Sequence, residues 1–163
     1  MNSTLPQRTV TALVQNEAGT INRLVSLFRR RGFSLASFNA GDCEDPGFSR
    51  LTLVLNANDA ELAQCLKQLD KLIDVVECET LTPETSVQRE LALVRVEPSE
   101  DQREVFYNLV LEFMGKTPLS AGNSVIVEYT GSVEDVQRLI EAMRPYNITE
   151  IVRTGAVAIK VEA

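Results

Sequence analysis

The turn Asn16-Glu17-Ala18-Gly19 is the segment of the sequence with the clearest potential for binding chemistry. It stands between an alternating pattern typical of a strand and a spacing of apolar residues typical of a helix. Amides at the start of such a helix can hold a carboxylate, Gly19 allows close approach of the backbone, and the Asn16 side chain offers both a donor and an acceptor. The same residue types also fill ordinary capping turns, so the spacing of the residues alone favours a structural role.

Catalytic and metal-binding constellations are missing from the sequence. None of the 163 residues is a histidine, which excludes imidazole bases, Ser-His and Cys-His pairs and imidazole metal ligands. Cys43, Cys65 and Cys78 are too few and too irregularly spaced for a disulfide framework or a zinc site, and they indicate a reducing compartment. The acidic residues of segment 42–45 lie among turn formers with no further ligands at metal spacing, which favours a solvated loop.

The charge balance argues against nucleic acid as a partner. Sixteen basic and twenty-three acidic residues give a net charge of −7, which repels a phosphate backbone. The run Arg29-Arg30-Arg31 falls at the C-terminus of the expected first helix, where cations oppose the helix dipole, and we interpret it as a solvated face. Residues 1–8 have no apolar signal region and no stretch reaches the ~20 apolar residues of a membrane span, so we expect a cytoplasmic protein without a membrane partner.

The first half of the chain predicts six elements that would position this turn. Apolar residues on one side of segment 9–15 indicate a strand, and Ile21, Leu24, Val25 and Phe28 form a helical stripe that ends at Gly32. Two strands joined by a turn-rich loop, a second helix and a further strand then follow, which gives the order β-α-β-β-α-β. The expected ranges are strands over 33–40 and 50–56, a helix capped by Asp59 and a strand over 73–80.

The second half repeats this order after a linker over 81–86, and the repetition predicts a duplicated architecture. Because segment 116–122 contains Pro118, we expect an edge or distorted strand there, and segment 156–161 predicts a short extra strand. Two such units imply α+β, ferredoxin-like sheets, each with helices on one face and an uncovered face opposite. Uncovered faces and free strand edges predict a homodimer, and packing of the two half-sheets on each other is the alternative.

A set of segments in a fixed order along nearly the whole chain resembles the small, regulatory subunit of acetolactate (acetohydroxyacid) synthase. The N-terminal half of that subunit is an ACT domain. Each segment alone is common, but the ordered set is specific. The segments are 16–19 with Arg23, 31–33, 45–46, 49–52, 67–75, 89–91, 130–131 and 153–155.

The resemblance implies an ACT domain over 1–81, which binds an effector and dimerises, and a C-terminal ACT-like, ferredoxin-like domain over 82–163. It implies a regulatory subunit without catalysis or a cofactor of its own. Its expected partner is a catalytic large subunit that carries thiamine diphosphate, magnesium and FAD. The chain would activate that subunit and confer feedback inhibition by valine, in branched-chain amino-acid biosynthesis.

The resemblance also implies the residues that would meet the effector. Asn16, Gly19, Thr20 and Ile21 would approach it from one protomer, and Ser34 and Leu35 from the other. The family usually has asparagine in place of Ser34 and isoleucine in place of Leu35, so both the polar reach and the apolar shape of this half differ here.

Two other functions fit parts of the pattern. A free-standing ACT amino-acid sensor for another protein would share the site and the dimer. A small ferredoxin-like hydrolase of the acylphosphatase kind would need an arginine in a phosphate-binding loop, and the loop after the first expected strand has Asn16 and Gly19 but no arginine cluster. The hydrolase is therefore the weakest of the three hypotheses.

Overall fold

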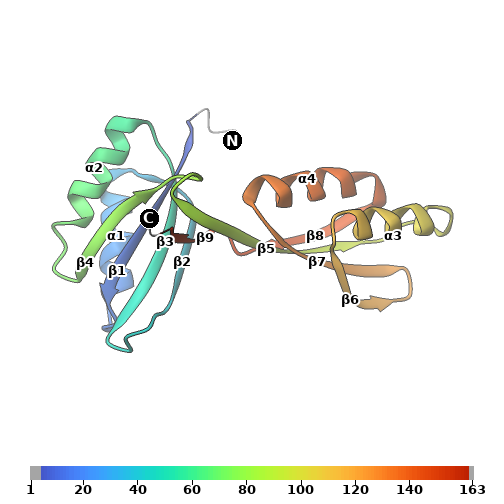
Figure 1. Cartoon of the computed structure of the whole chain (residues 1–163), viewed down its shortest axis with the longest axis horizontal. Coiled ribbons are helices and arrows are strands. Elements are labelled where there is room, and N and C mark those ends of the chain that lie inside the picture. The colour runs from blue at the N-terminus through green and yellow to red at the C-terminus, as the bar shows by residue number, and fades with distance from the viewer. Residues whose placement is uncertain (1–4, 162–163) are drawn as a thin grey trace. The chain divides into compact units, whose positions relative to one another are not determined.

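The computed structural model of the chain describes residues 5–161, which divide into two compact units (Figure 1). The first unit comprises residues 5–88 and 155–161, and the second comprises 89–154. The functional division at residue 81 stays a prediction. The compact units differ from it because β5 begins in the first unit and the last residues of the chain return to it.

The first unit has the predicted order of strand, helix, two strands, helix and strand. Its antiparallel sheet has the order β2-β3-β1-β4, so that β2 and β4 are the edges. The elements are β1 (Gln7–Gln15), α1 (Thr20–Arg31), β2 (Ser34–Asp42), β3 (Phe48–Asn56), α2 (Asp59–Leu69) and β4 (Val75–Leu81).

The buried face of α1 differs from the predicted stripe. Leu24 and Phe28 are buried as predicted, and Leu27 joins them in the core. Ile21 and Val25, which the periodicity also assigned to the core, are 40% and 48% exposed. Apolar residues cover a wider arc of this helix than one sheet face can bury, so periodicity alone does not decide which edge of the arc stays in solvent.

The start of α2 is displaced by one residue from the prediction. Asn58, not Asp59, is the N-cap: its side chain accepts a hydrogen bond from the Glu61 amide at 2.9 Å, and the Glu61 carboxylate accepts one from the Asn58 amide at 2.8 Å. Asp59 forms an ion pair with Arg8 at 2.6 Å instead. A reciprocal pair of this kind satisfies two helix-end amides at once, which an Asp59 cap would not do.

The face of the first sheet away from its helices is covered by residues 155–161, here called the C-terminal ribbon, which contains β9 (Val157–Lys160). The Asn39 side chain donates to the Ala156 carbonyl at 3.0 Å, and the Ala158 amide donates to Thr52 Oγ1 at 3.2 Å. Lys160 pairs with Glu79 at 2.6 Å. The predicted extra strand is therefore present, and it covers a face that the sequence left open. Side chains buried on that face are Thr9, Thr11, Thr52 and Val54.

Gly155 begins the ribbon at a point where only glycine fits. Its φ is +76°, and a Cβ built on it would lie 2.4 Å from the Cβ of Ser37. Any side chain there would displace the ribbon from β2.

The second unit repeats the arrangement with the sheet order β6-β7-β5-β8, and α3 and α4 lie together on one side of the sheet (Figure 1). The predicted irregular strand over 116–122 is confirmed, because β6 is an exposed edge strand whose register shifts between Lys116 and Leu119. The elements are β5 (Ser86–Val96), η1 (Glu100–Gln102), α3 (Arg103–Glu112), β6 (Lys116–Ala121), β7 (Ser124–Gly131), α4 (Val133–Met143), η2 (Arg144–Tyr146) and β8 (Ile148–Arg153).

Candidate functional site

The turn between β1 and α1 is built by backbone hydrogen bonds. The Asn16 amide donates to the Gly47 carbonyl at 2.9 Å, and the Thr20 amide donates to the Glu17 carbonyl at 3.2 Å. Gly19 is the N-cap of α1, with φ 96°, and no side chain caps the helix. Asn16 therefore does not cap the helix, and its side chain is exposed.

The start of α1 has unused hydrogen-bond donors. Within residues 5–161, the amides of Ile21 and Asn22 donate to no group, and no acidic residue lies in the first turn. The Thr20 side chain is buried, whereas Ile21 is half-exposed beside these amides. Free amides at a helix N-terminus next to an apolar side chain can hold a carboxylate and an aliphatic group together.

A buried ion pair fixes this turn against the sheet. Arg23 binds Asp74 with two nitrogens: Nε pairs with Oδ2, and Nη2 donates to Oδ1 at 2.8 Å. The Asp74 side chain is only 4% exposed, and its hydrogen bonds to Arg23 raise the pKa of that guanidinium. Both residues occur in the motifs that carried the resemblance, but 51 positions separate them, and no local pattern indicates that they pair.

Ser34 and Leu35 lie at the opposite end of the sheet. Ser34 pairs with Asn56 in the register of β2 and β3, and the Asn56 side chain donates to Ser34 Oγ at 3.2 Å. Leu35 is partly buried and packs against the core. Sequence analysis did not identify Asn56, which places an amide beside the position where the family usually has one.

One chain does not bring the two sets of predicted residues together. Asn16 follows Gln15, which pairs with Phe48 at one end of β3, whereas Ser34 pairs with Asn56 at the other end. Eight residues of strand separate these ends, which is roughly 25 Å. Within one chain, the two sets of residues therefore do not form a single site.

The cysteines and acidic side chains in the part of the chain that the structure describes are not arranged for catalysis or metal binding. Burial raises the pKa of Cys65 to about 12 and also raises that of Cys78, while Cys43 Sγ donates to the Asp45 carbonyl at 3.4 Å. Among residues 5–161, no three histidine, cysteine or acidic side chains gather as a metal site would require. No helix in the same range is long and apolar enough to cross a membrane.

Comparison with known proteins identifies the family. Residues 10–77 match the AHAS small subunit-like ACT domain, and residues 89–162 match the small subunit of acetolactate synthase. The chain is 36% identical over 155 residues to the acetolactate synthase small subunit of Bacillus subtilis, with 93% of this chain and 89% of that one covered. The chain belongs to the acetolactate synthase small-subunit family. This membership confirms the resemblance and supports a regulatory role in branched-chain amino-acid biosynthesis.

Two further relatives in this family are similar over almost their whole length. The acetolactate synthase small subunit of Mycolicibacterium smegmatis is 35% identical over 159 residues, covering 98% of this chain and 94% of its own. The crystal structure of the acetolactate synthase small subunit from Thermotoga maritima superposes with a TM-score of 0.88 at 35% identity, covering 98% and 99% of the two chains. Both units thus have the fold of this family.

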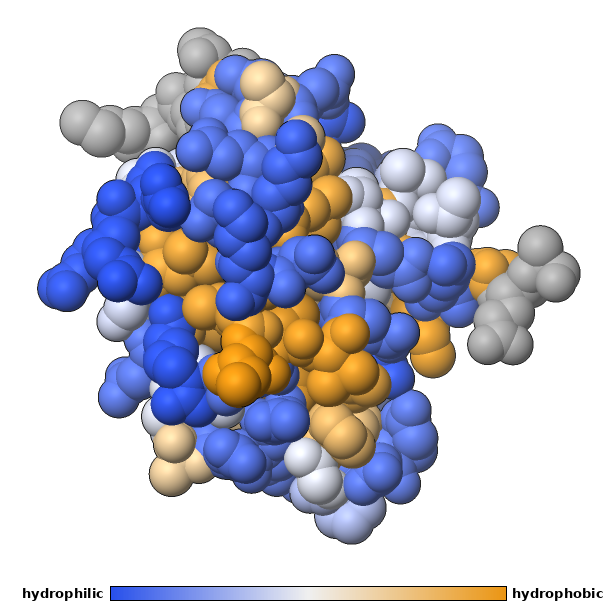
Figure 2. Space-filling model, turned by 90° about the vertical axis from the view of Figure 1, so that its left-hand side faces the viewer, coloured by the Kyte–Doolittle hydropathy of each residue, from blue (hydrophilic) through white to orange (hydrophobic). Residues whose placement is uncertain are grey.

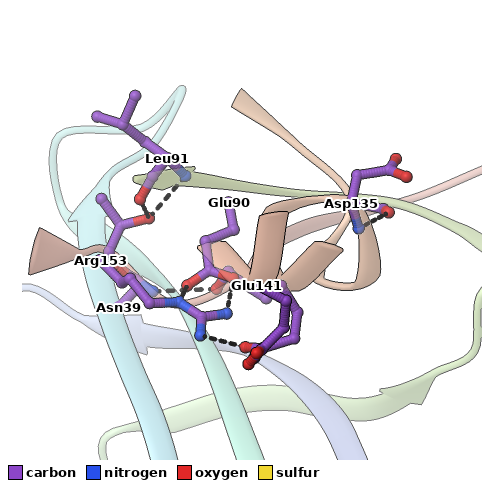
Figure 3. A network of polar contacts seen from close by, with 10 residues as sticks. Asn39, Glu90, Leu91, Asp135, Glu141 and Arg153 are labelled. Carbon is purple, nitrogen blue, oxygen red and sulfur yellow. Dashed lines mark hydrogen bonds and ion pairs between the residues drawn. The ribbon is translucent and has the colours of Figure 1, made fainter. Parts of the chain in front are cut away.

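Two of the family motifs meet in the second unit. Arg153, at the end of β8, binds Glu90 through Nε at 2.8 Å and Nη2 at 2.7 Å, and the Glu90 side chain is 3% exposed (Figure 3). A third nitrogen of Arg153 donates to Gln137 at 3.0 Å. The neighbouring Thr154 exchanges backbone and side-chain hydrogen bonds with Leu91. The contacts between segments 89–91 and 153–155 therefore connect β5 to the end of β8.

Proposed function

We propose that the chain activates the catalytic large subunit of acetolactate synthase and makes it sensitive to feedback inhibition by valine. The observation that carries this proposal is the uncapped start of α1, where free amides of Ile21 and Asn22 stand beside a half-exposed aliphatic side chain. An amino acid such as valine has a carboxylate for the amides and a small apolar side chain for Ile21. Thr20 and the open backbone of Gly19 would border the same site.

The second half of the site would come from a second copy of the chain. If the edge strands β2 of two copies pair antiparallel about their middle residue, Phe38, then the partner's Ser34 comes opposite Asp42. Asp42 pairs with Ser49, close to the end of β3 where Phe48 meets Gln15, so Ser34 and Leu35 of that copy would approach Asn16 and Gly19. A homodimer would thus complete two equal sites.

Activation and inhibition would be separate outputs of one complex. The effector would bias a conformational equilibrium of an already assembled enzyme, while the chain itself does no chemistry. Thiamine diphosphate, magnesium and FAD would belong to the large subunit.

The test is acetolactate formation by the large subunit of the same organism, with and without this chain and with and without valine. Activation by the chain, and inhibition by valine only when the chain is present, would support the proposal. The absence of any effect on activity would contradict it.

A free-standing amino-acid sensor for another protein is the competing function, because it would use the same turn and dimer. Co-purification separates the two: a regulatory subunit is recovered with the large subunit at a fixed ratio, and a free-standing sensor is not.

A further inference from the structure

The surface formed by α1, the end of α2 and the loop between α2 and β4 carries two adjacent hollows. One, of about 450 Å³, is lined in part by Arg23, Arg29 and Arg30. The other, of about 320 Å³, is lined in part by Arg30, Arg31 and Lys71. Arg30 and Leu72 line both hollows, so the two lie side by side, and together they are here called the basic groove.

Of the five cations that line the basic groove, only Arg23 is paired with a carboxylate in the part of the chain that the structure describes. Asp74 is engaged by Arg23, and no acidic residue is among those that line either hollow. Arg29, Arg30, Arg31 and Lys71 form no ion pair within the described residues 5–161. In a chain with a net charge of −7, this concentration of unpaired positive charge is a marked local exception. The helix dipole explains a cation in the last turn, but it does not explain the hollow that these side chains surround.

Exposed apolar side chains adjoin the basic groove. Ile73, next to Leu72 in the same loop, is 87% exposed, and Val25, one helical turn before Arg29, is 48% exposed. Figure 2 looks onto this side of the first unit and shows an apolar patch bordered by strongly hydrophilic side chains. Arginine is enriched at protein interfaces and among the residues that contribute most to binding, and here arginines adjoin exposed apolar side chains.

The length of the basic groove distinguishes a polypeptide from a compact anion. Its α1 residues run from Asn22 to Arg31. At the helical rise this distance is about 13 Å, which corresponds to about four residues of extended chain. A single phosphate or carboxylate would contact only a part of it.

We infer that the basic groove docks an acidic segment of the catalytic large subunit, with an apolar side chain of that segment against Ile73 and Val25. This inference rests on the proposed function and names the surface through which it would act. Because the groove begins at Asn22, the docked segment would contact the same helix whose first turn would hold the effector. A conformational change at the first turn of α1 would then be transmitted to the large subunit through α1 alone.

The experiment measures binding of the full-length chain to the large subunit by titration calorimetry in 50 mM and 500 mM salt. Arg29→Glu with Arg30→Glu should weaken binding at least about tenfold at low salt, because reversed charges face an acidic partner. Arg29→Lys with Arg30→Lys should keep most of the affinity. The matched control, here called the α4 control, combines Arg138→Glu on α4 with Arg144→Glu at the start of η2; it changes the net charge equally and should bind as the wild type does.

The outcomes separate this inference from the proposed function. A selective loss in the groove variant, together with weaker wild-type binding in high salt, would support it. Unchanged affinity of the groove variant, or an equal loss of affinity in the α4 control, would overturn this inference. If the wild type still activated the large subunit, the proposed function would remain intact. A wild-type chain that neither binds nor activates the large subunit would overturn both. Arg30→Gln with Lys71→Gln, which removes charge without reversing it, should show a smaller loss and covers the case in which the reversed variant misfolds.

Discussion

Gly19 combines two properties at the residue scale that no other residue type would keep. Its φ of +96° is unfavourable for any residue with a side chain, and a Cβ there would come within 3.1 Å of Arg23 Nη1. An open backbone at this position leaves the amides at the start of α1 accessible. The ion pair between Arg23 and Asp74 holds the same turn to the sheet. Gly19 thus keeps the amides accessible, and the neighbouring ion pair keeps the turn rigid.

Gly19→Asp should abolish the valine response while activation of the large subunit persists. The substitution places a carboxylate where the carboxylate of the effector would bind, and it also competes with Asp74 for Arg23. The loss of a charge-assisted interaction corresponds to an increase of about tenfold or more in the valine concentration needed for inhibition. Acetolactate assays at increasing valine concentration measure it.

Gly122→Asp is the matched control for this change. Gly122 also has a positive φ, of +62°, but no atom lies within 4 Å of its Cβ position, and it belongs to the second unit. It should keep the valine response. Loss of activation together with inhibition in a folded Gly19→Asp protein would mean that the turn contacts the large subunit directly.

Ser34→Asn should tighten valine binding. Serine is too short to offer both a donor and an acceptor at the reach of an amide, so the wild type would lack one charge-assisted hydrogen bond, worth roughly 1.5–3 kcal/mol or about ten- to a hundredfold in affinity. Titration calorimetry with valine, leucine and isoleucine measures the change.

Asn56 provides the control for the Ser34 prediction. Its side chain donates to Ser34 Oγ, so it already places an amide close to this half of the site. Asn56→Ser in the wild-type background should weaken binding if that amide substitutes for the missing one. Equal or weaker valine binding by Ser34→Asn would show that residue 34 does not limit affinity, and a preference for another amino acid would show a changed effector.

At the scale of elements, the spacing of apolar residues predicted the order of strands and helices correctly, because strands and helices repeat with different periods. The end of α1 was predictable from Gly32, which ends the helix in a left-handed conformation. Contacts between distant segments escaped prediction. The rotation of α1 that exposes Ile21 and Val25 depends on how a helix lies on its sheet, and the pairing of Arg23 with Asp74 depends on the fold that joins them.

The C-terminal ribbon is the clearest case of this limit. Its alternating residues predict a strand, but only the three-dimensional arrangement places that strand on the first sheet, more than 100 positions away from Thr52 and Asn39. The sequence predicted a face of the sheet without helices but not what covers Thr9 and Thr11 on it. They are buried because the ribbon lies over them.

Arg153→Met should destabilise the second unit strongly. The substitution keeps much of the side-chain volume but removes the guanidinium that pairs with the buried Glu90 carboxylate, and breaking a buried ion pair in this way costs about 3–5 kcal/mol. Arg138→Met on α4 is the control. It breaks an exposed pair with Asp135, which should cost far less stability because solvent screens the two charges. Denaturant unfolding compares the two, and similar free energies of unfolding would contradict a structural role for the Glu90–Arg153 pair.

At the scale of the whole molecule, the position of β2 at the edge of the first sheet is decisive. The C-terminal ribbon covers a face of that sheet but not this edge, and the two sets of predicted effector residues lie at opposite ends of the same sheet. Pairing of two β2 edges would satisfy their free backbone groups and join the two halves of the site. Dimerisation and the valine response should therefore depend on the same residues.

Lysines on the β2 edge should separate the dimer and abolish the valine response together. Antiparallel pairing about Phe38 places Ala36 of one copy opposite Ala40 of the other, and both alanines are exposed in the single chain. Ala36→Lys with Ala40→Lys would set like charges directly opposite each other at two points, which opposes pairing. Ala36→Lys with Ala40→Glu sets opposite charges at the same points and should restore both the dimer and the response. Sedimentation at micromolar concentration measures the mass, and a wild-type chain that is monomeric at every concentration would contradict the dimer and with it the shared site.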